Sequence, residues 1–446
     1  MKPPFDCRGA DVLVAGLGRS GQAAARLLAA RGAKVTGADE GRPEVGDLPR
    51  LAAVRLGEQG FPAAGRDLVV VSPGIPLAHP DLARARARGT LVVAEVELAS
   101  WFVAAPICGV TGTNGKSTTT ALAGEMLRAA GRRPFVGGNL GTPLCEAIGG
   151  DYDVLAVELS SFQLESIQTF RAGVAAFLNL TPDHLDRHGS LEGYAAAKAR
   201  LFANQAADGV AVLNAADPHS ARMAAAGPAA RRWFGGDAER AAAADALPVE
   251  GGFTIGPPGS AGERYALRNR ALRGAHNLEN AMAAALCARA LGAGPGAIQG
   301  ALDTFPGLPH RLEWIRERGG VEWINDSKAT NVESTAVALR AVAGPLWWIA
   351  GGRGKGAPYA PLRPLLAGRT RGALLVGEEA GTIDRELSDV VAPIHALTIE
   401  GAVRIAAERA RGGETVLLSP ACASYDQFAN YGARGDHFRR LVRALP

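Results

Sequence analysis

The sequence is poor in cysteine. Its 446 residues include five cysteines, at positions 7, 108, 145, 287 and 422, and no two of them form a CxxC pair. An odd number of scattered thiols fits neither a disulfide framework nor a zinc site. We therefore expect reduced, buried thiols and a cytoplasmic location.

The sequence also lacks long apolar runs and an excess of either charge. No apolar run reaches the length of about 20 residues that a membrane-spanning helix needs, and the first four residues do not resemble a signal peptide. The 48 lysines and arginines nearly balance the 44 acidic residues, for a formal net charge of +4, and the arginines are scattered. We therefore expect neither a membrane nor a nucleic acid as partner.

The chain is too long for one hydrophobic core, and its 47% apolar residues are enough to build several. Segments typical of strands alternate with segments typical of helices, which predicts an α/β fold. We predict three domains. They are a Rossmann-like domain over 1–94, a central domain with a mostly parallel, phosphate-binding sheet over 95–306, and a second Rossmann-like domain over 307–446.

The most specific motif lies in the central domain, where an apolar strand over 106–110 precedes a glycine loop and a helix. Backbone N–H groups of such a loop, together with the helix N-terminus, bind phosphate. Lys116 would add a mobile cation and Ser117 a hydroxyl group for magnesium. The loop is shorter than a standard Walker A motif, because valine stands at position 110 where that motif has glycine. The alternative is a chance glycine turn before a helix.

Two further strands of this domain end in polar residues. The strand over 154–157 delivers Glu158, which is placed to hold magnesium, although it could instead cap the helix that follows. The strand over 174–180 leads into a polar segment in which His184 lies beside Asp183 and near Asp186. This density of polar groups after a strand predicts a site.

Other candidates in this domain are less specific. Lys198 stands among alanines on the helix after Leu191 and, from the sequence alone, is an ordinary surface lysine. Asn277 and Asn280 lie three residues apart on one helix, where they could contact a nucleotide or cap the helix.

The first and third predicted domains also carry loops typical of ligand sites. The pattern G-x-G-x-x-G over 16–21 follows a strand, with Asp39 at the end of the next strand, and could bind a diphosphate. In the third domain, strands end in the polar loops 325–331, 351–356 and 419–426. Lys328 and Lys355 in these loops suggest anionic ligand groups; the alternative is a set of ordinary solvated loops.

Taken together, these segments resemble the Mur ligase family over nearly the whole chain. The resemblance is carried by residues 111–117, 158–163, 181–188, 307–311, 325–331 and 419–428. The short phosphate loop is the form that this family uses. Residues 325–331 and 419–424 are most similar to the members that add D-glutamate.

The resemblance implies an ATP-dependent, ADP-forming ligase of peptidoglycan precursor synthesis, and thus of cell-wall growth and cell division. ATP would phosphorylate the alanyl carboxylate of a UDP-linked muramoyl substrate. The amine of D-glutamate would then attack the acyl phosphate and form an amide. We expect two magnesium ions and a monomeric enzyme.

The resemblance also implies roles for individual residues. ATP would be bound by Gly112, Thr113, Asn114, Gly115, Lys116, Ser117, Thr118, Asn277, Asn280, Arg311 and Asp326. Magnesium would be held by Ser117, Glu158, His184 and Lys198, with Lys198 carbamylated. The UDP-linked substrate would contact Gly18, Arg19, Ser20, Gly74, Asn139, Ser160 and His184. D-Glutamate would contact Lys328, Thr330, Lys355, Ser424, Tyr425 and Tyr431. Catalysis would depend directly on Lys116, Asn139, Glu158, His184, Lys198, Asp326 and Lys328.

Three parts of the sequence depart from the family pattern. Glu40 and Gly41 stand where polar or basic uracil contacts are expected, and Arg42 is a candidate for the uracil contact. Arg353 replaces an expected acid, and Tyr431 an expected phenylalanine.

Other functions are compatible with parts of the sequence. Within the family, the amino acid or acceptor could differ, as in folylpolyglutamate synthases. The first glycine loop could serve a nicotinamide-dependent oxidoreductase, which would leave Lys116 without a role. A non-catalytic nucleotide-binding regulator would leave Glu158 and His184 unexplained.

Overall fold

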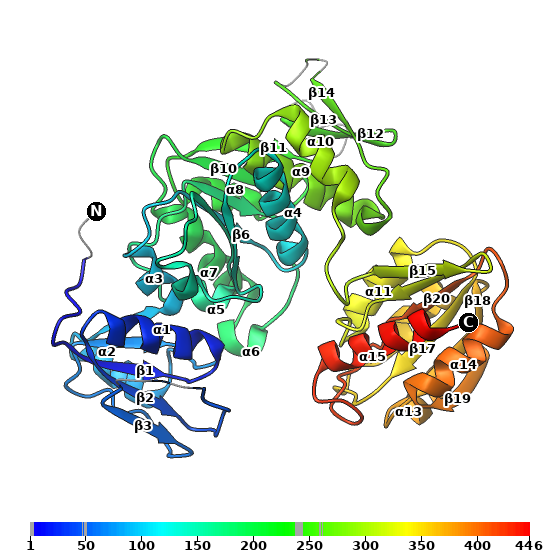
Figure 1. Ribbon diagram of the computed structural model, residues 1–446, viewed down its shortest axis with the longest axis horizontal. Helices are drawn as coiled ribbons and strands as arrows, with labels where there is room; N and C mark the ends of the chain where they lie inside the picture. Colours follow the sequence, from blue (N-terminus) through cyan, green and yellow to red (C-terminus); the bar gives the residue numbers. More distant parts are fainter. Residues whose placement is uncertain (1–3, 47, 49–50, 237–243, 258–259, 261) are drawn as a thin grey trace. The chain divides into compact units, whose positions relative to one another are not determined.

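The computed structural model describes residues 4–46, 48, 51–236, 244–257, 260 and 262–446. Residues 1–3, which belong to the segment judged not to be a signal peptide, lie outside this range. The chain forms two compact units (Figure 1). The first unit comprises Met1–Leu267 and His276–Thr304, and the second comprises Arg268–Ala275 and Phe305–Pro446. The domain boundaries at 94 and 306 stay predictions.

The N-terminal part of the first unit is a five-stranded parallel sheet in the order β3-β2-β1-β4-β5. Its elements are β1 (Asp11–Ala15), α1 (Arg19–Ala30), β2 (Lys34–Asp39), β3 (Ala53–Leu56), β4 (Leu68–Val71), α2 (Pro80–Ala87) and β5 (Leu91–Ala94). The strand order reverses between β1 and β4. At such a reversal the loops that follow two neighbouring strands diverge and leave room for a ligand.

The rest of the first unit is built on a nine-stranded sheet in the order β14-β13-β12-β11-β10-β9-β6-β8-β7, of which only the β12-β13-β14 end is antiparallel. The strands are β6 (Ile107–Thr111), β7 (Pro134–Gly138), β8 (Val154–Glu158), β9 (Val174–Phe177), β10 (Val210–Asn214), β11 (Ala230–Phe234), β12 (Ala246–Val249), β13 (Gly252–Ile255) and β14 (Glu263–Ala266).

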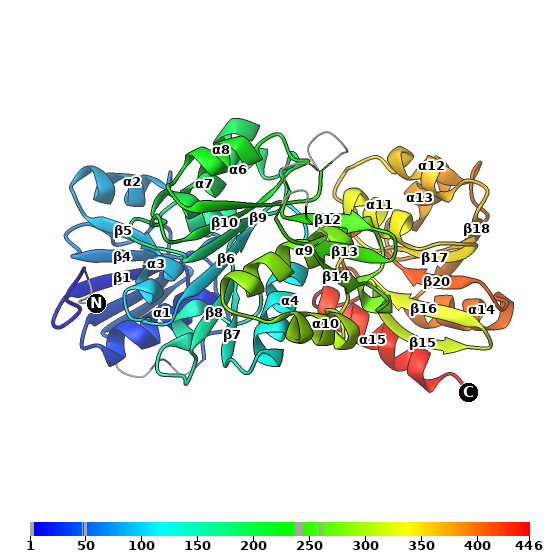
Figure 2. The same ribbon diagram turned by 90° about the horizontal axis from the view of Figure 1, so that it is seen from above.

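Helices cover both faces of this sheet, α4 and α10 on one and α7 and α8 on the other (Figure 2). The helices of this part are α3 (Glu95–Ser100), α4 (Lys116–Ala129), η1 (Leu144–Ala147), α5 (Ser161–Leu164), α6 (Leu185–His188), α7 (Leu191–Ala203), α8 (Ser220–Ala225), α9 (Ala275–Ala290) and α10 (Pro295–Thr304). The central strands β6, β8 and β9 are therefore buried along their whole length.

The second unit is a six-stranded sheet in the order β15-β16-β20-β17-β18-β19, parallel except for β15. Its strands are β15 (Glu313–Arg318), β16 (Val321–Asn325), β17 (Leu346–Gly351), β18 (Thr370–Val376), β19 (Pro393–Leu397) and β20 (Thr415–Leu418). Its helices are η3 (Arg270–Leu272), α11 (Val332–Ala341), η4 (Ala360–Leu362), α12 (Arg363–Leu366), α13 (Ala380–Leu387), α14 (Ile399–Arg409) and α15 (Tyr431–Ala444).

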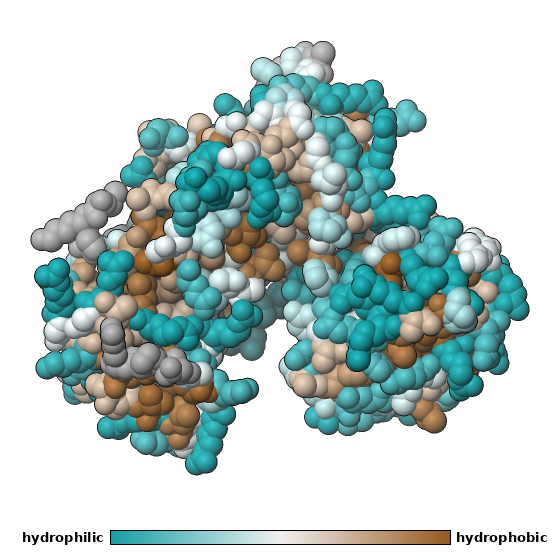
Figure 3. Space-filling model, viewed as in Figure 1, coloured by the Kyte–Doolittle hydropathy of each residue, from teal (hydrophilic) through white to brown (hydrophobic). Residues whose placement is uncertain are grey.

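Alternation along β17 shows how the second unit makes two apolar layers. Trp348 packs in a cluster with α11, α12 and α13, whereas Trp347 packs in a cluster with α14 and α15. The face of this unit seen in Figure 3 is largely hydrophilic, as expected when both layers are enclosed between sheet and helices. The three largely parallel sheets confirm the predicted α/β fold class. Among the described residues, no helix is long and apolar enough to cross a membrane.

Helix α3 follows β5 without a loop and is held by two buried glutamates. Glu97 accepts hydrogen bonds from the backbone N–H groups of residues 168, 169 and 170, from the Thr169 hydroxyl and from the Trp101 indole. The Glu95 Oε1 accepts a hydrogen bond from the Cys145 N–H at 2.5 Å, and its Oε2 has no hydrogen-bond partner among the described residues. Burial raises the pKa of Glu95 to about 7.

The raised pKa of Glu95 predicts that the stability of the protein depends on pH. In the folded protein Glu95 keeps its proton up to about pH 7, whereas its ordinary pKa is 4.5. The free energy of unfolding therefore falls as the pH rises through that interval. Glu95→Gln cannot ionise, so the variant should be more stable than the wild type at pH 8 by roughly 1 to 3 kcal/mol and should lose this advantage near pH 4. Urea unfolding at several pH values measures the effect.

Glu97→Gln is the matched control. In this variant an amide NH₂ faces the donors that bind the carboxylate in the wild type. Unlike Glu95→Gln, it should therefore destabilise the protein at pH 8. Equal stability curves for the wild type and Glu95→Gln would contradict the assignment.

Candidate active site

The glycine loop between β6 and α4 has the predicted strand–loop–helix form. Gly112 and Gly115 have positive φ angles, of 152° and 85°. Lys116 begins α4, followed in its first turn by Ser117, which is buried, and Thr118. The Lys116 Nζ folds back over the loop and donates to the carbonyl oxygens of Gly112 at 3.0 Å and Thr113 at 2.8 Å. A cation thus lies over a helix N-terminus, an arrangement suited to phosphate.

Asn280 packs directly against this loop. A Cβ atom on Gly115 would lie 2.1 Å from Asn280 Oδ1, so only glycine fits there. The same oxygen accepts from the Thr119 hydroxyl at 3.3 Å, and Asn280 Nδ2 donates to Asn277 Oδ1 at 3.1 Å. Both asparagines are buried and lie inside α9 rather than at its cap, so the capping alternative is wrong.

Glu158 ends β8 and is buried beside Asn139. Asn139 Nδ2 donates to Glu158 Oε1 at 2.6 Å, whereas Oε2 has no hydrogen-bond partner among the described residues. The helix that follows is capped by Ser160, whose side chain pairs reciprocally with Gln163, so the alternative that Glu158 is the cap is wrong. A buried anionic oxygen without a donor is a suitable ligand for a cation, and the donor set fits magnesium.

His184 is the N-cap residue that precedes α6 and has a left-handed conformation, with φ at 53°. Its ring lies 4.8 Å from the ring of Phe162, and its Nε2 lies 3.5 Å from the Asp183 carboxylate. The side chain is about half exposed, at 47%. Within the described part of the chain, no three His, Cys, Asp or Glu side chains form a metal-binding group. Magnesium bound here would keep ligands from water or phosphate, as it usually does.

Lys198 is 1% exposed, so the interpretation as a surface lysine is wrong. Its Nζ donates to the Gly112 carbonyl oxygen at 2.8 Å and lies 4.4 Å from the centre of the Tyr194 ring. Burial, and then the charge of Lys116, hold the pKa of Lys198 well below its usual range. Helix α7 thus places a buried amine, whose neutral form is favoured, against the phosphate loop.

The predicted contacts of the N-terminal sheet lie in loops that follow β1 and β4. Gly18 caps α1, Arg19 and Ser20 form its first turn, and Gly74 lies in the turn after β4. The two loops are joined, since the Ser72 hydroxyl donates to the Gly16 carbonyl oxygen at 2.8 Å. They therefore form one loop pair at the point where the strand order reverses.

Glu40 and Gly41, which depart from the family pattern, form hydrogen bonds beside the first glycine loop. Asp39 accepts from the backbone N–H groups of Leu17 and Gly41, at 2.7 and 2.8 Å. Glu40 accepts from the backbone N–H of Gly60 at 2.8 Å. These carboxylates shape the edge of the sheet beside the first glycine loop.

In the second unit, Asp326 follows β16 and is buried. Its Oδ1 accepts from the Leu312 N–H at 3.1 Å and its Oδ2 from the Ser419 hydroxyl at 2.9 Å. Burial raises the pKa of Asp326 to about 7, opposed by these hydrogen bonds and by the charge of Arg311. The loops that carry Arg311, Asp326 and Ser419 are thus held together.

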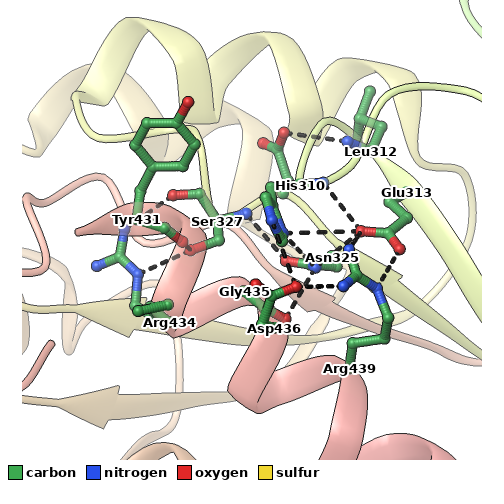
Figure 4. Close-up of polar contacts among 12 residues, drawn as sticks. His310, Leu312, Glu313, Asn325, Ser327, Tyr431, Arg434, Gly435, Asp436 and Arg439 are labelled. Atoms are coloured by element: carbon green, nitrogen blue, oxygen red, sulfur yellow. Dashed lines mark hydrogen bonds and ion pairs between the residues drawn. The ribbon is translucent and has the colours of Figure 1, made fainter. Parts of the chain in front are cut away.

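Lys328 and Thr330 extend from the same loop. The Lys328 Nζ lies 5.6 Å from the centre of the Tyr431 ring at the start of α15. Arg434, one turn further along α15, is buried and donates to the Ser327 hydroxyl and carbonyl oxygens (Figure 4). It also donates to the Cys422 carbonyl oxygen. This guanidinium group joins the loops that follow β16 and β20.

The loops after β17 and β20 are joined by backbone hydrogen bonds of 2.9 Å in both directions between Arg353 and Ala423. This brings the segment with Lys355 next to Ser424, which is buried, and Tyr425, which is 66% exposed. The side chain of Arg353, the unexpected residue, forms a two-bond ion pair with Glu378 at 2.9 and 3.1 Å.

Two neighbours of the phosphate loop were not predicted from the sequence. Asn179 Oδ1 accepts from the Asn114 N–H at 2.9 Å, and the Tyr194 hydroxyl lies 3.4 Å from the Thr113 hydroxyl. Asn179 comes just after β9, and Tyr194 precedes Lys198 by four residues, one helical turn. A search for polar residues after strand ends could find Asn179, whereas Tyr194 could be found only from its spacing to Lys198.

The sequence matches three family models along its length. Residues 10–94 match the model "Mur ligase MurD-like, N-terminal domain", residues 110–288 the "Mur ligase middle domain", and residues 310–422 the "Mur ligase, glutamate ligase domain".

Similar proteins cover nearly the whole chain. The UDP-N-acetylmuramoylalanine–D-glutamate ligase of Anaeromyxobacter dehalogenans is 55% identical and covers 98% of both chains. That of Myxococcus xanthus is 51% identical, over 98% of this chain and 99% of the relative. Among solved structures, the UDP-N-acetylmuramate-alanine ligase of Thermotoga maritima has a TM-score of 0.62 at 18% identity, over 98% of this chain and 99% of that one, which shows a shared fold.

The contact between Gly115 and Asn280 predicts that Gly115→Ala weakens ATP binding. The added methyl group must displace Asn280 or the loop, which costs about 1.4 kcal/mol or more. We therefore expect the dissociation constant for ATP to rise by about 10-fold or more. Titration with a fluorescent ATP analogue measures the constant.

Gly131→Ala, at the other end of α4, is the matched control. Gly131 has a similar φ of 79°, but nothing lies within 4 Å of the added Cβ. Both variants carry the strain of a left-handed residue, about 1 kcal/mol, so only the steric contact differs. Unchanged affinity in Gly115→Ala would show that the loop does not bind the nucleotide.

Proposed function

The chain belongs to the Mur ligase family, and we propose that it joins D-glutamate to UDP-N-acetylmuramoyl-L-alanine with conversion of ATP to ADP and phosphate. The observation that carries the proposal is the similarity to D-glutamate ligases along the entire chain, phosphate loop and polar loops included. The enzyme is therefore an ATP-dependent acid–amino-acid ligase.

In the first step, the γ-phosphoryl group passes to the alanyl carboxylate. The N–H groups of loop residues 112–118 and the Lys116 ammonium group would bind the phosphates and offset the charge that develops during transfer. Asn139 and Ser160 would orient the carboxylate to be phosphorylated. Asn277 and Asn280 from α9 would contact the nucleotide.

Glu158, Ser117 and His184 would hold magnesium, with Lys198 as a further ligand once carbamylated. Bound magnesium would supply Lewis acidity at the phosphoryl oxygens. The orphaned Oε2 of Glu158 supports its role, since this buried oxygen needs a positive partner.

Carbamylation of Lys198 is supported by its surroundings. The neutral amine adds to carbon dioxide, and the resulting carbamic acid loses a proton to give an anion. The depressed pKa of Lys198 favours the neutral amine over the ammonium form. The product is an anion that attracts the neighbouring Lys116 cation, whereas a protonated Lys198 would be repelled by it.

In the second step, the amine of D-glutamate attacks the acyl phosphate, and the tetrahedral intermediate collapses to the amide and phosphate. Lys328, Lys355, Thr330 and Ser424 would bind the two carboxylates, beside Tyr425 and Tyr431. Gly18, Arg19, Ser20 and Gly74 would hold the UDP part of the other substrate at the first loop pair, where a helix N-terminus favours a diphosphate.

The proposal predicts ADP release that requires both substrates. A coupled assay should show turnover with UDP-N-acetylmuramoyl-L-alanine and D-glutamate together, and only background with either one alone. L-Glutamate, other amino acids and a folate acceptor are the comparison substrates. ADP release that does not depend on D-glutamate would exclude this function, and turnover with another amino acid would reassign the substrate.

The carbamate predicts chemical rescue. Lys198→Ala should lower kcat by roughly 100-fold or more, as expected when a group that stabilises transition-state charge is lost. Formate or acetate should restore part of the rate, because the carboxylate can take the place of the carbamate. Lys116→Ala is the control, since a lost cation should not be rescued by an anion. Wild-type kcat in Lys198→Ala would rule the carbamate out.

A further inference from the structure

Arg187 lies in α6, three residues after His184, but its side chain is largely buried. Only 12% of the Arg187 side chain and 15% of the Glu165 side chain are exposed. The guanidinium Nη2 donates to Glu165 Oε2 at 2.7 Å, and Nε donates to Oε1 at 3.1 Å. A two-bond pair with little solvent contact fixes its orientation far better than a surface ion pair does.

The same pair fixes the rings around His184. The guanidinium group lies 4.8 Å from the centre of the Phe162 ring, which itself lies 4.8 Å from the His184 ring. Glu165 also contacts His188 Nδ1 at 3.4 Å. The His184 side chain therefore rests on an aromatic ring that Arg187 holds from α6.

Arg187 also reaches the N-terminal sheet. Its Nη2 donates to the carbonyl oxygen of Ile75 at 3.1 Å. Ile75 lies in the turn after β4, next to Gly74, and its N–H donates to the Ser72 carbonyl oxygen at 3.0 Å. The Ser72 hydroxyl in turn bonds to Gly16 in the first glycine loop. One side chain thus connects the first loop pair with the His184 loop.

We propose that Arg187 and Glu165 form a positioning pair for the ligase reaction, which couples the loop pair that holds the UDP-linked substrate to the loop that carries His184. The inference rests on the proposed function. The substrate is held at one end by the N-terminal sheet and reacts at its other end, so the distance between the two loops sets the position of the carboxylate. Arg187 does not touch the reacting atoms; it fixes this distance.

Arg187→Lys tests the pair. Lysine keeps the charge but cannot form the two-bond pair and the Ile75 bond together. We expect kcat to fall roughly 10- to 100-fold, the size of effect that misplacement by about 1 Å produces, with the affinity for UDP changed less than about 3-fold. Glu165→Gln should act in the same direction.

A second measurement does not depend on turnover. Addition of UDP should slow amide hydrogen exchange in the 181–190 segment of the wild type, and Arg187→Lys should abolish this protection while protection of the 16–21 loop remains. A merely structural pair would leave the protection intact and lower only the melting temperature.

Arg26→Lys is the matched control. Arg26 of α1 pairs with Glu146 of η1 at 3.1 Å, which also joins the N-terminal sheet to the central part, but both side chains are more than 40% exposed, at 42 and 43%. This variant should keep the wild-type kcat and the exchange pattern. Wild-type kcat and wild-type protection in Arg187→Lys would overturn the inference, whereas an inactive wild type would contradict the proposed function instead.

Discussion

The carbonyl oxygen of Gly112 accepts hydrogen bonds from two lysine side chains, Lys116 at 3.0 Å and Lys198 at 2.8 Å. Burial, and then repulsion from the charge of Lys116, hold the pKa of Lys198 well below its usual range. Such a site gains stability from any anion that reaches it. Phosphate on one side and a carbamate on the other would relieve the same repulsion, so one electrostatic constraint explains both the nucleotide site and the chemistry proposed for Lys198.

Parallel strands bring the residues of this site together. The strands β6, β8 and β9 are neighbours in one sheet, so the residues that follow them lie at the same edge. That edge gathers the phosphate loop, Glu158 and the segment with His184, while α7 and α9 add Lys198 and Asn280 from the sides. The second unit repeats the principle, with Asp326, Lys355 and Ser424 in the loops after β16, β17 and β20.

Strand-end residues were therefore the part of the site that the sequence could predict. Glu158 and Asp326 each follow an apolar segment, and their positions need only the strand to be recognised. The prediction that Lys198 is a surface residue is wrong, because its contacts leave no mark beside it in the sequence. They are the Gly112 carbonyl oxygen, from another element, and the Tyr194 ring, from the preceding helical turn. The contact of Arg187 with Ile75 was equally invisible, since partners 112 residues apart leave no local pattern.

The absence of glycine at position 110 follows from the same geometry. Val110 is fully buried in β6, paired with Glu158 on one side and Ala176 on the other. Glycine there would weaken a central strand without helping the loop, because the chain leaves the sheet only after Thr111. The glycines stand instead at 112 and 115, where positive φ and the contact with Asn280 require them. The loop is short because the strand that carries it continues one residue past the position where a Walker A motif would begin to turn.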